Sequence, residues 1–212
     1  MNPTENRRPL ASRQTGWAAW ATRRLAATQV TPNQISMIGM AAALVAGLAF
    51  WAAGGATGAG RVILLLLATL FVQARLLCNL FDGMVAVEAG RGAPDGPFWN
   101  EFPDRVSDGL ILIGVALGVG EPALGWAAVG FAFLTAYTRE LGVNCGVGAD
   151  FSGPMAKQHR MALVTGAAVL SVLAPLWGWR GEILTAALWV IAIGAALTAL
   201  RRAANLVSKL KG

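Results

Sequence analysis

Six apolar stretches, separated by short polar segments, constrain the fold of this chain more than any other feature. A helix needs roughly 20 mostly apolar residues to cross a membrane. The chain is 56% hydrophobic and only 13% charged, whereas soluble domains carry about 25% charged residues. We therefore predict an all-α integral membrane protein whose six spanning helices form a bundle. The predicted spans cover residues 34–53, 62–80, 106–119, 124–138, 161–177 and 183–200.

The residues before the first span predict a helix that lies in the membrane interface. Trp17 and Trp20 alternate with Arg23 and Arg24, a pattern typical of an amphipathic helix at the headgroup level. The pattern leaves open whether this helix only anchors the chain or also shapes a site. The expected division is a cytoplasmic N-terminal segment at 1–30, a membrane domain at 31–205 and a basic cytoplasmic tail at 206–212.

The distribution of lysine and arginine predicts the orientation. With six spans, both termini and the connections after the second and fourth spans lie on one side of the membrane. All but three of the 17 basic residues fall there; Arg61 and Arg180 fall on the opposite side, and Arg75 lies within the second span. We expect a bacterial inner-membrane protein with cytoplasmic termini. The formal net charge of +6 is then a topology signal, and no motif indicates a nucleic-acid partner.

Six of the 11 acidic residues fall in the 30 residues from Asn79 to Asp108, at the cytoplasmic ends of the second and third spans. Helical spacing puts Asn79, Asp82, Gly83 and Ala86 on one face and Asn100, Asp104 and Asp108 on another. Pro103 is tolerated only in the first turn of a helix, so we expect the third helix to start near residues 100–102. A short connection makes the two helices antiparallel neighbours, with their polar faces opposed.

Oxygen ligands on two facing helices suit a hard cation such as Mg²⁺, Mn²⁺ or Ca²⁺. His159 is the only histidine, which excludes a multi-histidine zinc site. Mg²⁺ usually binds one or two carboxylates together with substrate phosphates. The pattern therefore predicts a metal-bridged diphosphate site at the cytoplasmic face. The predicted metal ligands are Asn79, Asp82, Asn100, Asp104 and Asp108. For Glu88, Asp95 and Glu101, a role in the solvated connection or in helix capping is the favoured interpretation.

The spacing across this window resembles the motif of the CDP-alcohol phosphatidyltransferase family, D-x2-D-G-x2-A-R-x8-G-x3-D-x3-D. This chain reads N-LF-DG-MV-A-V-EAGRGAPD-G-PFW-N-EFP-D. Every gap has the length of the family pattern, and the six-helix architecture extends the resemblance over most of the chain. Three positions differ, because Asn79 and Asn100 replace the first and third aspartates and Val87 replaces the arginine. The two asparagines remove two negative charges while keeping two oxygen ligands, and so favour fewer or weaker ions.

The resemblance implies that an acceptor alcohol attacks a CDP-linked lipid, with CDP-diacylglycerol the expected donor, and that CMP is released. It implies Asp104 as the general base, Mg²⁺ or Mn²⁺ as the cofactor, and a homodimer. Gly83, Ala86 and Gly96 are expected to bind the nucleotide.

Basic residues beside the fourth and fifth spans predict a small polar, anionic acceptor held by charge-assisted hydrogen bonds. The candidates are Arg139, Lys157, His159 and Arg160. Ordinary positive-inside flanking is the alternative, equally favoured for Lys157 and His159. Two other functions remain open. A lipid transporter would need polar residues near the membrane centre, whereas a catalytically silent CDP-lipid-binding protein would release no CMP in the presence of metal.

Overall fold

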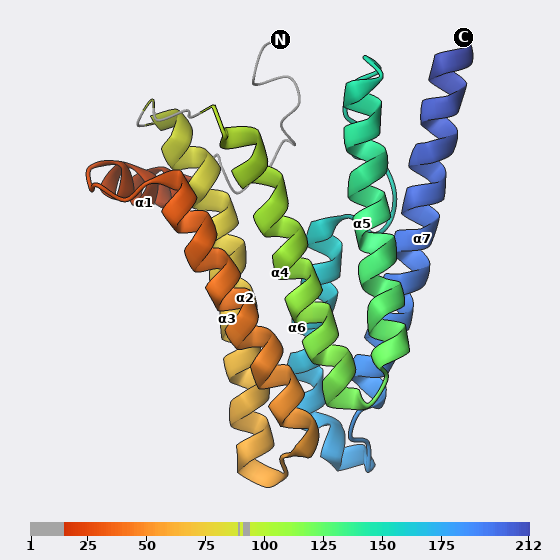
Figure 1. The fold of residues 1–212 in the computed structure, drawn as a ribbon. Coiled ribbons are helices and arrows are strands. Elements are labelled where there is room, and N and C mark those ends of the chain that lie inside the picture. The colour runs from red at the N-terminus through yellow and green to blue at the C-terminus, as the bar shows by residue number, and fades with distance from the viewer. Residues whose placement is uncertain (1–14, 89, 91–93) are drawn as a thin grey trace.

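The computed structural model describes residues 15–88, 90 and 94–212, and these fold into seven α-helices and one 3₁₀ turn, with no strand among them. Figure 1 shows the first helix lying across one end of a bundle in which the later helices run along a common axis. Arg7, Arg8, Arg13 and Arg91, which the sequence predicts on the basic side, lie outside the described residues. The elements are α1 (Gly16–Ala26), α2 (Pro32–Gly55), α3 (Gly58–Glu88), α4 (Gly96–Val119), α5 (Pro122–Asn144), α6 (Lys157–Leu173), η2 (Ala174–Trp177) and α7 (Glu182–Lys211).

Four of the described helical segments are long and apolar enough to cross a membrane: Pro32–Gly55, Gly58–Glu88, Lys157–Trp177 and Glu182–Lys211. The predicted third and fourth spans lie within α4 and α5, which are not among these four segments. The prediction of an all-helical bundle is thus confirmed, while the count of six spans stays a prediction. Residues 206–211, predicted as a tail, are the last turns of α7.

Helix α1 packs on the last turns of α3, at the end of the bundle shown uppermost in Figure 1. The rings of Trp17 and Phe81 meet edge to face at 6.1 Å, and Thr22 Oγ1 lies 3.7 Å from Met84 Sδ. Trp20 is 58% exposed. The interfacial role of α1 stays a prediction, but its position is fixed against the helix that carries Asn79 and Asp82.

Helix α2 begins at Pro32, two residues before the predicted span, and Thr31 caps it. The Gln34 amide donates to Thr31 Oγ1 at 3.2 Å, and the Thr31 amide donates to Gln34 Oε1 at 2.9 Å. This reciprocal pair is a capping box. Pro32 follows in the first turn, where its missing N–H costs no helical hydrogen bond.

The predicted start of α4 is wrong. The helix begins at Gly96, so Pro103 lies inside it. The turn before the proline is held by side-chain contacts that sequence spacing did not indicate: Phe98 and Phe102 stack with ring centroids 4.9 Å apart, and Trp99 Nε1 donates to Asp95 Oδ2 at 2.9 Å. These contacts compensate for the backbone hydrogen bond that Pro103 cannot donate.

Close backbone contact joins α2 to α4. A Cβ added to Gly114 would lie 2.3 Å from the carbonyl oxygen of Gly47, and a Cβ added to Gly47 would lie 2.4 Å from that of Leu110. Only residues without a side chain allow two helices to approach this closely. The contact fixes α4, and with it Asp104, relative to α2 and α3.

We expect Gly114→Ala to lower the free energy of unfolding by about 1–3 kcal/mol, because the new methyl group forces α2 and α4 apart. Gly130→Ala on α5 is the matched control, since a Cβ there meets nothing within 4 Å, and it should be neutral or slightly stabilising. Thermal unfolding in detergent measures both changes. Equal stability of the two variants would contradict the close packing of α2 against α4.

Candidate active site

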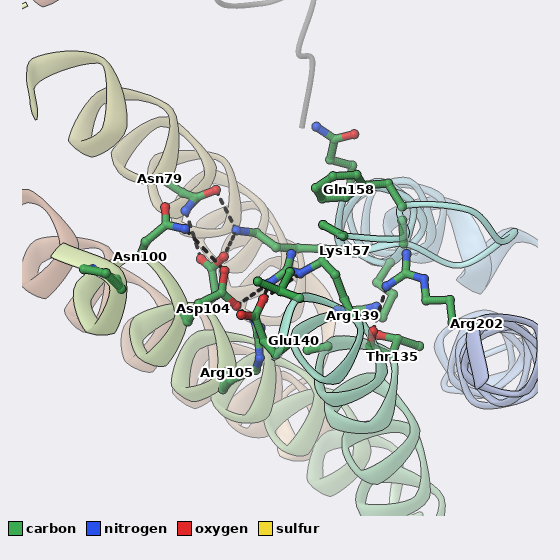
Figure 2. Close-up of a pocket in the computed structure, with 18 of the residues that line it drawn as sticks. Asn79, Asn100, Asp104, Arg105, Thr135, Arg139, Glu140, Lys157, Gln158 and Arg202 are labelled. Atoms are coloured by element: carbon green, nitrogen blue, oxygen red, sulfur yellow. Dashed lines mark hydrogen bonds and ion pairs between the residues drawn. The ribbon is translucent and has the colours of Figure 1, made fainter. Parts of the chain in front are cut away.

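A cleft of about 260 Å³ opens among α3, α4, α5, α6 and α7 (Figure 2). Its lining joins motif residues of α3 and α4 to basic residues of α5, α6 and α7. Five basic and three acidic side chains line it, an excess of two positive charges that favours an anionic ligand. The basic ones are Arg105, Arg139, Lys157, Arg160 and Arg202, and the acidic ones are Glu101, Asp104 and Glu140.

Asp104 lies at the centre of the polar contacts in the cleft (Figure 2). Its Oδ1 accepts hydrogen bonds from Arg75 Nη2 and Asn79 Nδ2, each at 2.9 Å. Its Oδ2 is paired with Lys157 Nζ, which also donates to Asn79 Oδ1 at 2.6 Å. Residues from α3, α4 and α6 therefore meet in one cluster, and two cations compensate the charge of Asp104.

Asp108 lies one turn deeper in the bundle and is 1% exposed. Its Oδ2 accepts from Arg160 Nη2 at 2.6 Å, and its Oδ1 lies 3.7 Å from Arg75 Nη2. Arg160 is also held by the Met155 carbonyl, to which its Nη1 donates at 3.0 Å. The structure thus places Asp108 in a buried ion pair behind the cleft.

Asp82 points away from Asn79, towards α2. Its Oδ2 accepts a hydrogen bond from Ser36 Oγ at 2.9 Å, and its Oδ1 accepts from the Gly83 amide. The side chain is buried with 8% exposure, and it does not line the cleft, although Asn79 and Gly83 do. The two predicted ligands of α3 therefore face different neighbours.

One wall of the cleft is formed by linked ion pairs between α4 and α5. Glu101 pairs with both Arg105 and Arg139, and Arg139 also contacts Glu140 at 2.8 Å. The Arg139 guanidinium lies 5.8 Å from the ring centroid of Phe151, within the range of a cation–π contact. Glu101, interpreted from the sequence as part of the solvated connection, is therefore a cleft residue.

The remaining predicted residues are divided between the cleft and the surface. Asn100 lines the cleft, and its Nδ2 donates to Glu101 Oε1 at 3.3 Å. Ala86 and Gly96 are half-buried and lie outside the lining. His159 is exposed, with Nδ1 2.8 Å from the Pro154 carbonyl oxygen, so the structure does not bring it to the cleft.

The connection at residues 145–156 is bound to α7, which positions Phe151 and the start of α6. Arg202 Nε donates to the Ser152 carbonyl at 2.9 Å. Asp150 accepts from the Ser152 amide at 2.7 Å and from Asn205 at 3.0 Å. Partial burial raises the pKa of Asp150, but these hydrogen bonds outweigh it and leave the pKa below its usual range.

The donor set does not fit a divalent cation well. Among the residues that the structure describes, no three histidine, cysteine, aspartate or glutamate side chains are grouped to hold a metal ion. Of the five predicted ligands, Asp82 and Asp108 face away from the cleft and are bonded to Ser36 and Arg160. Both oxygens of Asp104 already accept from cationic nitrogens. An ion would need the carboxylates that the chain lacks at residues 79 and 100.

Sequence reasoning missed the roles of Arg75, Arg105 and Arg202. Arg75 had a usable signal, because an ionisable side chain inside an apolar span is costly and usually functional; it is 2% exposed and touches both Asp104 and Asp108. Arg105 and Arg202 looked like ordinary positive-inside flanking residues. Only the packing of α4 and α7 against α5 brings them to the cleft.

No family model matches the chain. It is 29% identical over 197 residues to phosphatidylinositol phosphate synthase of Streptomyces avermitilis, covering 89% of this chain and 75% of that protein. It is 30% identical over 96 residues to archaetidylinositol phosphate synthase of Pyrococcus horikoshii, covering 45% of this chain and 46% of the relative.

The fold matches solved structures of Mycobacterium tuberculosis phosphatidylinositol phosphate synthase. The form with CDP-DAG bound gives a TM-score of 0.73 over 89% of this chain and 92% of that one, at 20% identity. The complex with manganese and citrate gives 0.74 over 90% and 88%, also at 20% identity. Fold and relatives fit the CDP-alcohol phosphatidyltransferase family, in agreement with the enzyme class predicted from the motif. With the apolar helices, they indicate an integral membrane protein.

Proposed function

We propose that the chain transfers a phosphatidyl group from a CDP-linked lipid, CDP-diacylglycerol, to a phosphorylated polyol and releases CMP. The observation that carries the proposal is one cleft in which the motif residues Asn79, Gly83 and Asp104 adjoin a basic wall. The relatives are synthases of inositol-phosphate lipids by name, which supports an acceptor of this chemistry. The predicted bacterial inner membrane, cytoplasmic cleft and homodimer belong to the same proposal.

In this proposal, the donor lies along α3 and α4 and the acceptor lies between α4 and α5. The glycine at residue 83 leaves room for the nucleotide at the cleft, and Lys157 faces the diphosphate. The acceptor phosphate is bound by Arg105 and Arg139, whose guanidinium groups suit bidentate contact with phosphate oxygens. The excess of positive charge in the lining compensates an anionic acceptor.

The chemical step forms a bond between the acceptor oxygen and the β-phosphorus of the donor. The bond from that phosphorus to the bridging oxygen breaks, and CMP leaves with this oxygen. The proton of the acceptor hydroxyl passes to the carboxylate of Asp104, which lines the cleft. A carboxylate is a weak base for a hydroxyl, so positioning of the two substrates supplies most of the rate enhancement.

The predicted Mg²⁺ or Mn²⁺ cofactor stays a prediction for this chain. A metal ion would neutralise the diphosphate if it were bound, and the manganese complex belongs to a structural neighbour. Because the side chains of the cleft fit a divalent ion poorly, the proposed step does not depend on one.

A second candidate function is binding of CDP-lipid without turnover. The observation that favours it is the engagement of both Asp104 oxygens by Arg75, Asn79 and Lys157, which a proton acceptor must partly release. The two candidates differ in CMP release. Both require the donor to bind in the same cleft.

Purified protein incubated with CDP-diacylglycerol and a pool of polar alcohols, including inositol phosphates, tests the proposal. Lipid mass spectrometry should find a new phospholipid, and nucleotide analysis should find an equal amount of CMP. Donor binding without either product would support the binding-only function. No binding of CDP-diacylglycerol would contradict both.

We expect Arg139→Met to raise the KM for an anionic acceptor by about 10- to 100-fold, because a hydrogen bond to a charged group contributes about 1.5–3 kcal/mol. The KM for the CDP-lipid should change little. Arg201→Met is the matched control, since Arg201 is exposed on α7. Steady-state kinetics with both substrates varied measures the effect, and a parallel rise in both KM values would argue against an acceptor-specific role.

A further inference from the structure

Lys157 occupies the position between the two helices where the sequence predicts a divalent cation. Its ammonium donates to Asn79 Oδ1 on α3 at 2.6 Å and pairs with Asp104 Oδ2 on α4. Both partners are predicted metal ligands. Asn79 Nδ2 also donates to Asp104 Oδ1 at 2.9 Å, so the three side chains form a closed arrangement around a single positive charge (Figure 2).

The charges of the site are already balanced by side chains. Three carboxylates, Asp82, Asp104 and Asp108, lie near three cations, Arg75, Lys157 and Arg160. A divalent ion would add two positive charges to this partly buried cluster. Charge taken out of water is costly unless it is paired, and the asparagines at residues 79 and 100 leave no additional carboxylate to pair with it.

Lys157 is also suited to bind a phosphate. An ammonium group has three donors, of which two are directed at Asn79 and Asp104. The residue lines the cleft, and it is the first residue of α6, where the helix dipole favours an anion. The remaining donor and the helix terminus are therefore both available to an anionic group.

We infer that the Lys157 ammonium replaces the divalent cation and binds the diphosphate of the CDP-linked lipid, so that the donor binds without Mg²⁺ or Mn²⁺. This inference rests on the proposed function, because it concerns the donor of that same cleft. The motif resemblance, in contrast, implies that Mg²⁺ or Mn²⁺ is the cofactor of this site. The asparagines and Lys157 then act together, since uncharged ligands at residues 79 and 100 suit a single charge better than a double one.

The first test measures metal binding directly, by the loss of the free Mn²⁺ signal in electron paramagnetic resonance. The wild-type protein should take up no Mn²⁺ at millimolar concentration, with or without CDP-diacylglycerol. The triple variant Asn79→Asp, Asn100→Asp, Lys157→Met, which restores two carboxylates and removes the ammonium, should bind Mn²⁺. Stoichiometric Mn²⁺ binding by the wild-type site would overturn the inference.

The second test measures the binding of CDP-diacylglycerol in detergent micelles. Wild-type affinity should be the same in excess EDTA and in Mg²⁺, and Lys157→Met should lower it by about 10- to 100-fold. Lys209→Met, at an exposed position near the end of α7, is the control. The EDTA comparison uses only wild-type protein, so it holds even if Lys157→Met folds poorly. Donor binding that requires Mg²⁺ would overturn the inference alone, whereas donor binding in neither condition would overturn the proposed function as well.

Discussion

Replacing Asp104 with asparagine should lower kcat by about 10²- to 10⁴-fold, the contribution typical of a positioned general base. The asparagine amide has nearly the shape of the carboxylate but does not accept the acceptor's proton. Binding of CDP-diacylglycerol should persist, because Lys157 keeps its contact with Asn79 and its place in the cleft. CMP release under single-turnover conditions measures the chemical step.

Asp95→Asn is the control for this change. Asp95 precedes α4, is exposed and accepts from Trp99 and Asn33 outside the cleft. Thermal unfolding of both variants separates a lost proton acceptor from a lost partner of Arg75 and Lys157. A folded Asp104→Asn protein that turns over at the wild-type rate would exclude Asp104 as the base.

Arg160→Met should destabilise the protein by about 3–5 kcal/mol, the usual cost of leaving one charge of a buried pair without its partner. Arg160 is 3% exposed and is bonded to Asp108 at 2.6 Å. After the substitution, the nearest cationic nitrogen to Asp108 is that of Arg75, at 3.7 Å and already bonded to Asp104. Equilibrium unfolding in a denaturant measures the loss.

A double variant makes the cause testable. Replacing Asp108 with leucine in the Arg160→Met protein removes the unpaired charge, and most of the lost stability should return. Arg201→Met serves as the exposed arginine control. A double variant less stable than Arg160→Met would contradict the ion-pair explanation and indicate that both side chains contribute mainly by packing.

The helices themselves were predictable because apolar length and capping are local properties. Thr31 and Pro32 determine the start of α2 by contacts within four residues. The predicted start of α4 is wrong because Phe98, Phe102 and Trp99 stabilise a turn before Pro103. The preference of proline for the first turn of a helix does not by itself indicate this turn.

The division of the predicted ligands follows from helix rotation, which sequence spacing conceals. Successive residues turn by about 100°, so Asp82 and Gly83 point in directions about 100° apart, and only Gly83 reaches the cleft. Likewise, Asp108 lies about 80° around the helix from Asn100 and about 12 Å further along it. Residues assigned to one helix face over two turns can therefore still point into different sites.

The pairing of the cations with the carboxylates of the site was not predictable from spacing. Lys157 and Arg160 reach Asp104 and Asp108 because the connection at 145–156 is tied to α7 by Arg202 and Asn205. This tertiary arrangement brings together residues more than 50 positions apart. The sequence indicated Asp104, Lys157 and Arg160 separately, whereas the fold supplied their pairing and added Arg75, Arg105 and Arg202 to the site.

A structure of the protein with CDP-diacylglycerol, determined in the presence of Mn²⁺ with the anomalous signal of manganese recorded, tests the account most directly. The account predicts the donor diphosphate in the cleft, within hydrogen-bond distance of Lys157 Nζ, and no manganese peak between Asn79 and Asp104. A manganese ion there, with Lys157 displaced, would contradict the replacement of the cation. A donor bound outside the cleft would contradict the proposed function itself.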